Sequence, residues 1–215
     1  MKEKIDISTW VRKDHFNFFN TFEEPFFGVT VDVDCTVTYE EAKEKAASFF
    51  LLYLHKSLHA ANAIEPFSYR IIDGEVWKYD AVHASATINR PNGTFGFGYI
   101  DFYENFDDFS ANAKQEIEKV QATTGLIASS SGDNVIHFSA LPWLNFKSIS
   151  HARSFSHQDS CPKISFGKVR DENGRKLMAV SVHVNHALMD GFHVSQYVDR
   201  FQELLHQKNE ELILG

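Results

Sequence analysis

The chain has 215 residues, of which 43% are hydrophobic and 14% aromatic, including 20 phenylalanines. This length and composition suit one globular domain with a large core, and we expect a single domain over residues 1–215. The formal net charge of −8 argues against a nucleic-acid or anionic membrane surface, because both need a basic footprint.

The two cysteines, Cys35 and Cys161, are too few for a disulfide framework or a metal cluster. No apolar stretch approaches the length of about 18 residues that a membrane span needs. The first residues are charged and lack the apolar segment of a secretory signal. A reducing cytoplasm is therefore the expected location.

The first half of the chain is predicted to contain a short helix, a strand, a long helix and three short strands. The helix covers residues 8–19, and the strand alternates through Phe27, Val29, Val31 and Val33. Thr38-Tyr39-Glu40-Glu41 has a capping-box pattern and predicts the start of one core helix that reaches about Leu58. Strands follow over 67–72, 76–79 and 82–88, with Asp73-Gly74 as a tight hairpin turn.

The second half begins with an extended segment over 95–102 and a more polar helix over 106–121. A strand over 135–141 ends at Pro142, and strands over 163–170 and 176–185 are joined by a turn that contains Asn173-Gly174. The last helix has an apolar stripe from Val194 to Leu205. The expected fold class is α/β of the α+β type, a two-layer sandwich with a mixed β-sheet covered by helices.

Residues 182–193, Val-His-Val-Asn-His-Ala-Leu-Met-Asp-Gly-Phe-His, are the most informative part of the chain. A buried strand ends at His186, and Asp190-Gly191 opens a helix four residues later. An imidazole at the end of a rigid strand is well placed to act as a general base. The spacing alone favours a simpler alternative, in which Asp190 is only the N-cap of the helix and His186 a structural turn residue.

Metal chemistry finds little support among the 11 histidines. His183 and His186 face opposite sides of a strand, which is poor geometry for two ligands of one metal. The chain has no HExxH, CxxC or GxSxG motif and no phosphate-binding loop. We therefore expect no metal site.

Three blocks of sequence together resemble one family. Residues 185–191, Asn-His-Ala-Leu-Met-Asp-Gly, are similar to a His-His-x-x-x-Asp-Gly signature, with Asn185 in place of the first histidine. Residues 6–16 and 139–146 resemble the amino-terminal helix and the serine-bearing segment of the same family. The chain thus resembles the type A chloramphenicol acetyltransferases, from the superfamily that includes the catalytic cores of dihydrolipoamide acyltransferases, over nearly its whole length.

The resemblance implies acetyl transfer from acetyl-CoA, as a co-substrate, to a hydroxyl group. His186 would be the general base, and Ser139 would donate a hydrogen bond to the oxyanion of the tetrahedral intermediate. Asp190 would pair with Arg12 and orient the turn that carries His186. No metal would take part.

The family also implies a homotrimer with active sites between subunits. Lys168 matches a lysine near the cofactor, and the residues that match the acceptor pocket are Phe18, Phe19, Phe95 and Ser165. His151 and Asp159 stand where the family has leucine and tyrosine, which weakens the burial of an aromatic acceptor. Two alternatives stay open: the same chemistry on a more polar alcohol or amine, and a catalytically silent ligand-binding protein.

Overall fold

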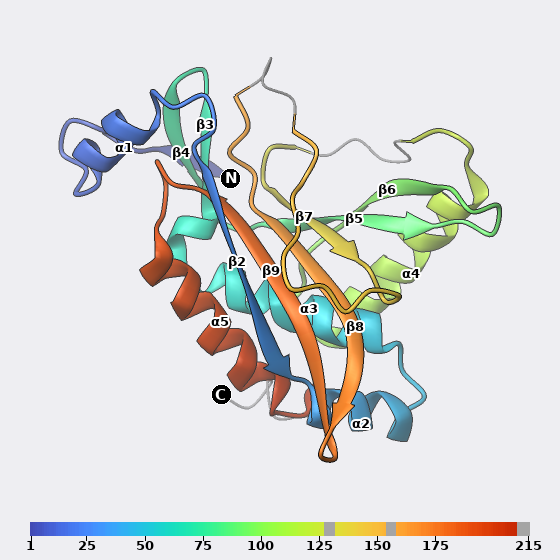
Figure 1. Cartoon of the computed structure of the whole chain (residues 1–215). Coiled ribbons are helices and arrows are strands. Elements are labelled where there is room, and N and C mark those ends of the chain that lie inside the picture. Colours follow the sequence, from blue (N-terminus) through green and yellow to red (C-terminus); the bar gives the residue numbers. More distant parts are fainter. Residues whose placement is uncertain (127–131, 154–157, 210–215) are drawn as a thin grey trace.

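A six-stranded mixed sheet forms the centre of the computed structural model, which describes residues 1–126, 132–153 and 158–209 (Figure 1). The strand order is β2-β9-β8-β7-β5-β6. The pairs β5–β7 and β7–β8 are parallel, and the other neighbouring pairs are antiparallel. The strands are β2 (Phe26–Asp34), β5 (His83–Asn89), β6 (Phe95–Ile100), β7 (Val135–Ala140), β8 (Lys163–Glu172) and β9 (Arg175–Asn185).

A smaller antiparallel sheet has the order β1-β4-β3. It consists of β1 (Lys2–Lys4), β3 (Tyr69–Ile72) and β4 (Glu75–Tyr79). β1 was not predicted, because its exposed residues carry no apolar alternation and pair with β4 through the backbone. The strand expected from residue 67 begins only at Tyr69, since Glu65–Ser68 form a 3-10 turn.

Two-residue turns close both predicted hairpins. Asp73 and Gly74 have φ values of 52° and 77°, and Asn173 and Gly174 have values of 54° and 80°. Positive φ at both central positions matches the twist of the flanking strands, and Asn, Asp and Gly tolerate it best. The two turn predictions are confirmed.

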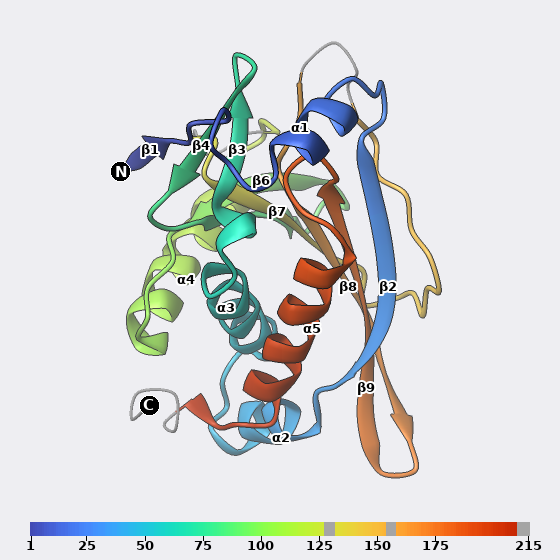
Figure 2. The ribbon, with the colours of Figure 1, turned by 90° about the vertical axis from the view of Figure 1, so that its left-hand side faces the viewer.

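The described residues also form five α-helices, and Figure 2 shows α3 and α5 side by side on one side of the large sheet. The helix predicted over 8–19 begins only at Lys13, after a series of turns. The helices are α1 (Lys13–Phe19), α2 (Thr36–Glu44), α3 (Phe49–Asn62), α4 (Phe106–Ala122) and α5 (Gly191–Leu205).

The single long helix expected from Thr38 to about Leu58 is wrong, because the chain forms α2 and α3 there. Ala46 has a φ of 49°, in the left-handed region, and breaks the helical path. The Ser48 side chain then accepts a hydrogen bond from the Leu51 amide and caps α3. Thr38 is not a cap: it lies inside α2, and its hydroxyl donates to the carbonyl of Leu205 over 2.7 Å. The presence of a threonine at position 38 is therefore explained by this tertiary contact with Leu205.

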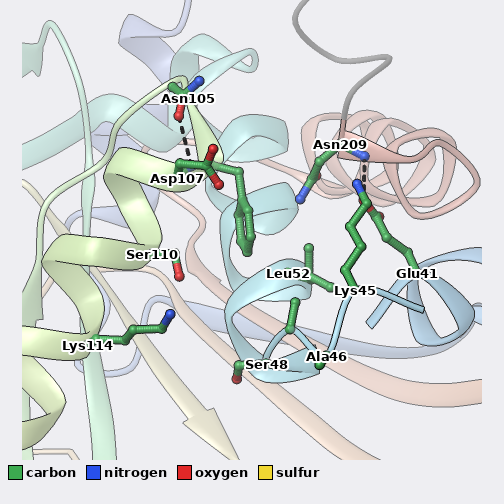
Figure 3. A pocket seen from close by; sticks show the side chains of 12 residues that line it. Glu41, Lys45, Ala46, Ser48, Leu52, Asn105, Asp107, Ser110, Lys114 and Asn209 are labelled. Carbon is green, nitrogen blue, oxygen red and sulfur yellow. Dashed lines mark hydrogen bonds and ion pairs between the residues drawn. The ribbon is translucent and has the colours of Figure 1, made fainter. Parts of the chain in front are cut away.

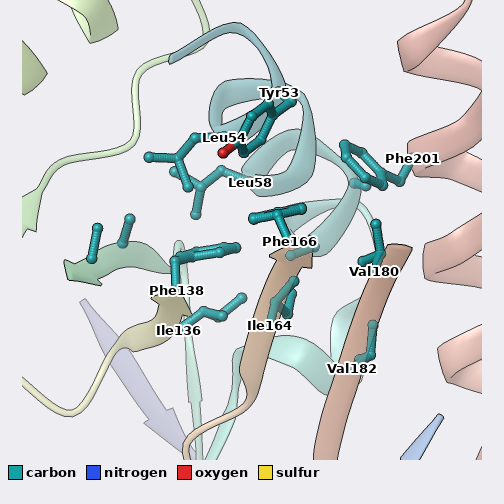
Figure 4. Packing of buried hydrophobic residues seen from close by; sticks show 14 of the residues in the cluster. Tyr53, Leu54, Leu58, Ile136, Phe138, Ile164, Phe166, Val180, Val182 and Phe201 are labelled. Atoms are coloured by element: carbon teal, nitrogen blue, oxygen red, sulfur yellow. The ribbon is translucent and has the colours of Figure 1, made fainter. Parts of the chain in front are cut away.

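The main core lies between the sheet and the helices (Figure 4). The rings of Phe138 in β7 and Phe166 in β8 are parallel to within 3°, with centroids 6.0 Å apart. Tyr53 from α3 and Phe201 from α5 pack against Phe166. Side chains at alternate positions of each strand enter this core, as the period of a half-buried strand requires.

The other side of the central strands, which we call the polar face, is formed by Ser139, Lys163, Ser165, Ser181 and His183. A β-bulge interrupts β8 on this side between Phe166 and Val169. At the bulge the Lys168 amide donates to the carbonyl of Leu144 over 2.8 Å. The fold class is confirmed: a mixed sheet with helices on one side.

Candidate active site

His186 lies immediately after β9, in a turn held by both backbone and packing. Its amide donates to the carbonyl of Pro25 over 2.8 Å. Its imidazole stacks on Phe19, with centroids 3.9 Å apart and an interplanar angle of 8°, and it contacts Phe27 at 4.7 Å. Its Nδ1 is buried and has no hydrogen-bond partner in the described part of the chain. Aromatic packing and the turn therefore orient this ring.

Asp190 is the N-cap of α5 and also the partner of Arg12, so both predicted contacts of this residue are present. Its carboxylate accepts from the Phe192 amide over 3.0 Å and from Arg12 Nη1 over 2.8 Å. Burial would raise the pKa of Asp190, but the hydrogen bond and charge of Arg12 hold it below its usual value. Because the Arg12 side chain is only 10% exposed, this pair firmly ties α1 to the start of α5.

His193 is a third member of this group that the sequence reading did not identify. Its Nδ1 accepts from the Asp190 amide over 3.2 Å and completes a capping box. The same nitrogen lies 3.0 Å from Asp190 Oδ1, which would be an ion pair only if the ring were protonated. Burial lowers the pKa of His193, and the neutral ring with an unprotonated Nδ1 fits the contact with the Asp190 amide but not a bond to the Asp190 carboxylate.

Ser139, Ser165 and Ser181 occupy adjacent positions on neighbouring strands of the polar face. Ser139 pairs in register with Ser165, and Ser165 pairs with Ser181. The hydroxyl of Ser165 is buried without a hydrogen-bond partner among the described residues, whereas Ser139 is partly exposed. Three strands therefore present a row of hydroxyl groups.

The register separates Ser139 from His186 within one chain. Ser139 is level with Ser181, and His186 follows Ser181 by five positions in and just beyond β9. At about 3.3 Å per strand residue, that is about 16 Å along the sheet, and two strand spacings add about 10 Å sideways. A base and an oxyanion donor must both lie about 3 Å from the reacting atoms. One copy of the chain does not bring them that close.

The predicted pocket residues are separated in the same way. Phe18 and Phe19 precede β2 at one edge of the sheet, and Phe95 begins β6 at the other. Five strand spacings place these edges about 24 Å apart. Phe18 is 60% and Phe95 44% exposed. Lys168, the predicted cofactor contact, is exposed at the bulge of β8.

A partly buried ion pair beside the predicted pocket has no signal in the sequence. Lys163 is 5% exposed, and its Nζ lies 2.7 Å from the carboxylate of Asp159. Burial would raise the pKa of Asp159, but the charge and hydrogen bond of Lys163 hold it below its usual value. The Arg153 guanidinium lies 3.6 Å from the centroid of the Phe26 ring, next to the same pair.

Two histidines extend this polar region. His151 meets His183 edge to face, with centroids 4.8 Å apart. Burial and the neighbouring His183 lower the pKa of His151 to about 4, which keeps the ring neutral near pH 7. Gly28 leaves room for His183, since a Cβ there would lie 2.3 Å from the imidazole. His151 and Asp159, which stand where the resemblance places apolar pocket residues, thus lie among charged and polar side chains.

A pocket of about 600 Å³ lies elsewhere, between α2, α3 and α4 (Figure 3). Its lining includes Glu41, which pairs with Lys45 over 2.9 Å and with the buried Lys56 over 3.5 Å. None of the predicted site residues lines it. This pocket is separate from the residues that the sequence singled out.

Two kinds of feature are absent from the described residues. Within ranges 1–126, 132–153 and 158–209, no group of three or more His, Cys, Asp or Glu side chains is placed to hold a metal ion. Among the helices of these ranges, none has the length and apolar character needed to cross a membrane.

Comparison with known proteins identifies the family. The family model described as chloramphenicol acetyltransferase matches residues 2–202. Chloramphenicol acetyltransferase 3 of Escherichia coli is 29% identical over 207 residues, covering 95% of this chain and 97% of that protein. Chloramphenicol acetyltransferase of Bacillus pumilus is 27% identical over 214 residues, covering 99% and 97%.

Solved structures agree with this result. A chloramphenicol acetyltransferase with 32% identity superposes with a TM-score of 0.86 and covers 95% of this chain and 100% of that one. The dihydrolipoamide acetyltransferase of Azotobacter vinelandii, at 17% identity, has a TM-score of 0.66 over 93% of this chain and 88% of its own, which shows a shared fold only. The chain belongs to the chloramphenicol acetyltransferase family.

Proposed function

We propose that the chain is a type A chloramphenicol acetyltransferase, which transfers the acetyl group of acetyl-CoA to a hydroxyl of chloramphenicol or a similar small acceptor. The main support is the placement of His186. Its ring is fixed by Phe19 at the end of a core strand, next to the Arg12–Asp190 pair, in a chain that matches the family over residues 2–202.

In this mechanism His186 takes the proton of the acceptor hydroxyl while that oxygen attacks the thioester carbonyl. The carbonyl oxygen becomes an oxyanion, which accepts a hydrogen bond from Ser139. When the tetrahedral intermediate collapses, the carbon–sulfur bond breaks and the CoA sulfur takes the proton from the imidazolium. Both substrates are bound together, which removes much of the entropic barrier.

Arg12 and Asp190 have a positioning role in this proposal. Their 2.8 Å contact joins α1, which carries Phe19, to the N-terminus of α5 just after the turn of His186. Loss of either partner would leave the other charge unpaired and partly buried, and would loosen the turn.

We further propose a homotrimer whose sites lie between subunits. The separation of about 16 Å along the sheet between the levels of Ser139 and His186 supports this, because a second copy can supply the missing half. Phe18, Phe19, Phe95 and Ser165 would line the acceptor pocket from two chains, and Lys168 would contact CoA. We propose that the chain is one domain, because one hydrophobic core includes residues from Val33 to Leu205. We also propose that the protein is located in the cytoplasm, where acetyl-CoA is available.

Thiol release from acetyl-CoA, measured with chloramphenicol and a panel of other alcohols and amines, tests the reaction. His186→Ala should lower kcat roughly 100- to 10,000-fold, the usual contribution of a general base. Equal thiol release by wild type and variant would contradict the assignment of the base. Absence of acceptor-dependent thiol release from the wild type would support the silent ligand-binding alternative.

Subunit mixing tests the interfacial site. Ser139→Ala and His186→Ala proteins are each expected to be nearly inactive. If each site takes its serine and histidine from different chains, randomly mixed trimers have both groups intact in about a quarter of their sites. Activity that appears after unfolding and refolding the two variants together would support the proposal. No recovery despite trimers in solution would contradict it.

A more polar acceptor is the second candidate, and the ion pair of Lys163 with Asp159 favours it. With His151, this pair supplies hydrogen-bonding groups where an aromatic ring would prefer apolar contact. The same acceptor panel decides between the two candidates. A higher kcat/KM for a polar alcohol or amine than for chloramphenicol would identify the polar compound as the acceptor, and the proposed acetyl-transfer mechanism would stay the same.

A further inference from the structure

Asn185, the last residue of β9, builds the turn that presents His186. Its side chain is 2% exposed, and its Oδ1 accepts a hydrogen bond from the Ala187 amide over 2.9 Å. Its backbone carbonyl accepts from the amides of Leu188 and Met189 over 3.1 and 3.2 Å. Three amides beyond His186 therefore converge on this one residue.

The other end of the Asn185 amide reaches a different part of the chain. Its Nδ2 donates to the backbone carbonyl of Asp159 over 3.2 Å. The Asp159 carboxylate is in turn held by Lys163 Nζ at 2.7 Å and by the Cys161 amide at 2.9 Å. Since Lys163 belongs to β8, a continuous set of contacts runs from the sheet through Asp159 to the turn of His186.

This set of contacts is separate from the Arg12–Asp190 pair. Arg12, at the start of α1, contacts Asp190, which follows the turn of His186 and begins α5. Asn185 precedes His186 in the chain and contacts Asp159 on the polar face. The imidazole of His186 is positioned by its backbone and by two aromatic rings. Displacement of a reacting group by about 1 Å costs on the order of 100-fold in rate, so both supports of the turn bear on the chemistry.

We infer that Asn185 is a positioning residue for His186 and that the partly buried Lys163–Asp159 ion pair is its anchor. The inference rests on the proposed role of His186 as the base. An amide suits this position because it donates to one carbonyl and accepts from one amide at once. An alanine would leave the Ala187 amide and the Asp159 carbonyl without these partners.

Steady-state kinetics of Asn185→Ala, at saturating acceptor and per folded protein, provide the first test. We expect kcat to fall roughly 10- to 100-fold, while the KM for acetyl-CoA stays within about twofold, because the base is misplaced and the cofactor site is intact. An unchanged kcat in a folded protein would overturn the inference. His186→Ala is the reference: if that variant is also fully active, the proposed function itself fails.

A double-mutant cycle tests whether the Lys163–Asp159 pair anchors Asn185. Its charge-removing variant also tests the inference if Asn185→Ala alone folds poorly. Lys163→Met with Asp159→Asn removes both charges together and leaves the Asp159 carbonyl in place. We expect it to lower kcat about three- to tenfold, and Asn185→Ala to add less than about threefold in that background. Full multiplication of the two effects would overturn the anchoring role. The matched control is Arg170→Gln with Asp32→Asn, an ion pair of the same sheet away from the turn, which should leave kcat unchanged.

Discussion

The two faces of the central sheet use neighbouring residues for different purposes. In β7, Phe138 points into the helix-covered core, while Ser139 lies on the polar face in register with Ser165. The side that faces the core consists of apolar side chains packed against one another, so each of these residues contributes to the free energy of unfolding. The polar face has Lys163 paired with Asp159 and His183 packed against His151, whereas the Ser165 hydroxyl has no hydrogen-bond partner among the described residues. Predictions on each face follow, from the largest effect to the smallest.

Phe138→Ala should cause the largest loss of stability. The side chain is 1% exposed and stacks on Phe166, so truncation leaves a cavity in the middle of the core. We expect the free energy of unfolding to fall by about 3–5 kcal/mol, as for other buried phenylalanines. Chemical denaturation measures it, and a loss below about 1 kcal/mol would contradict this view of the core.

Ser139→Ala, one residue further along, should affect rate and hardly stability. Loss of an oxyanion donor raises the barrier by about 2.7–4 kcal/mol, which is roughly 100- to 1,000-fold in kcat. The hydroxyl is partly exposed, so we expect the melting temperature to change little. Acetyl-transfer kinetics and thermal unfolding of the same preparation separate the two effects. A large drop in melting temperature would assign Ser139 to structure.

His55, on the helix side of the sheet, should make stability depend on pH. It is 1% exposed, its Nε2 contacts the Tyr103 carbonyl at 2.9 Å, and burial lowers its pKa to about 4. The pKa of His55 is about 6.5 in the unfolded chain and about 4 in the folded protein. Between these pH values the unfolded chain binds a proton that the folded protein does not, so the free energy of unfolding decreases as the pH falls. Denaturation of wild type and His55→Gln at pH 7 and 5 should show a smaller loss in the variant. Parallel pH profiles would contradict this.

Arg170→Gln should have the smallest effect. Arg170 donates to the Asp32 carboxylate over 2.9 Å and also bonds Glu172, but both carboxylates lie at the protein surface. Exposed pairs contribute about 0–1 kcal/mol, and salt weakens them further. Denaturation at low and high salt should show a small difference that disappears at high salt.

Local patterns were enough to predict most of the fold. Period-two alternation located the strands of the large sheet, and Asp73-Gly74 and Asn173-Gly174 predicted hairpins because these residues accept positive φ. The break between α2 and α3 was missed because Ala46 carries no sequence signal for its left-handed φ. Tertiary packing determines that break.

The site was predicted only in part. The Arg12–Asp190 ion pair is present as the resemblance implies, and His186 follows the end of β9 as the apolar alternation predicts. No sequence pattern indicates the ion pair of the buried Lys163, because its partner Asp159 lies in a segment without regular structure. Contacts of this kind depend on how the segment folds back on the sheet, which residue spacing does not encode.

The bulge in β8 inserts one extra residue and so changes which positions of the strand face the core. Before it, even-numbered Ile164 and Phe166 face the helices; after it, odd-numbered Val169 packs against the core. Deleting one residue at the bulge would leave Val169 two positions after Phe166, so both side chains would still face the core. The deletion would instead remove the displaced backbone whose Lys168 amide bonds the Leu144 carbonyl. A single-residue deletion at the exposed Lys168 should therefore keep the core and release the segment around Leu144, whereas one deleted residue elsewhere in β8 would turn part of the strand over.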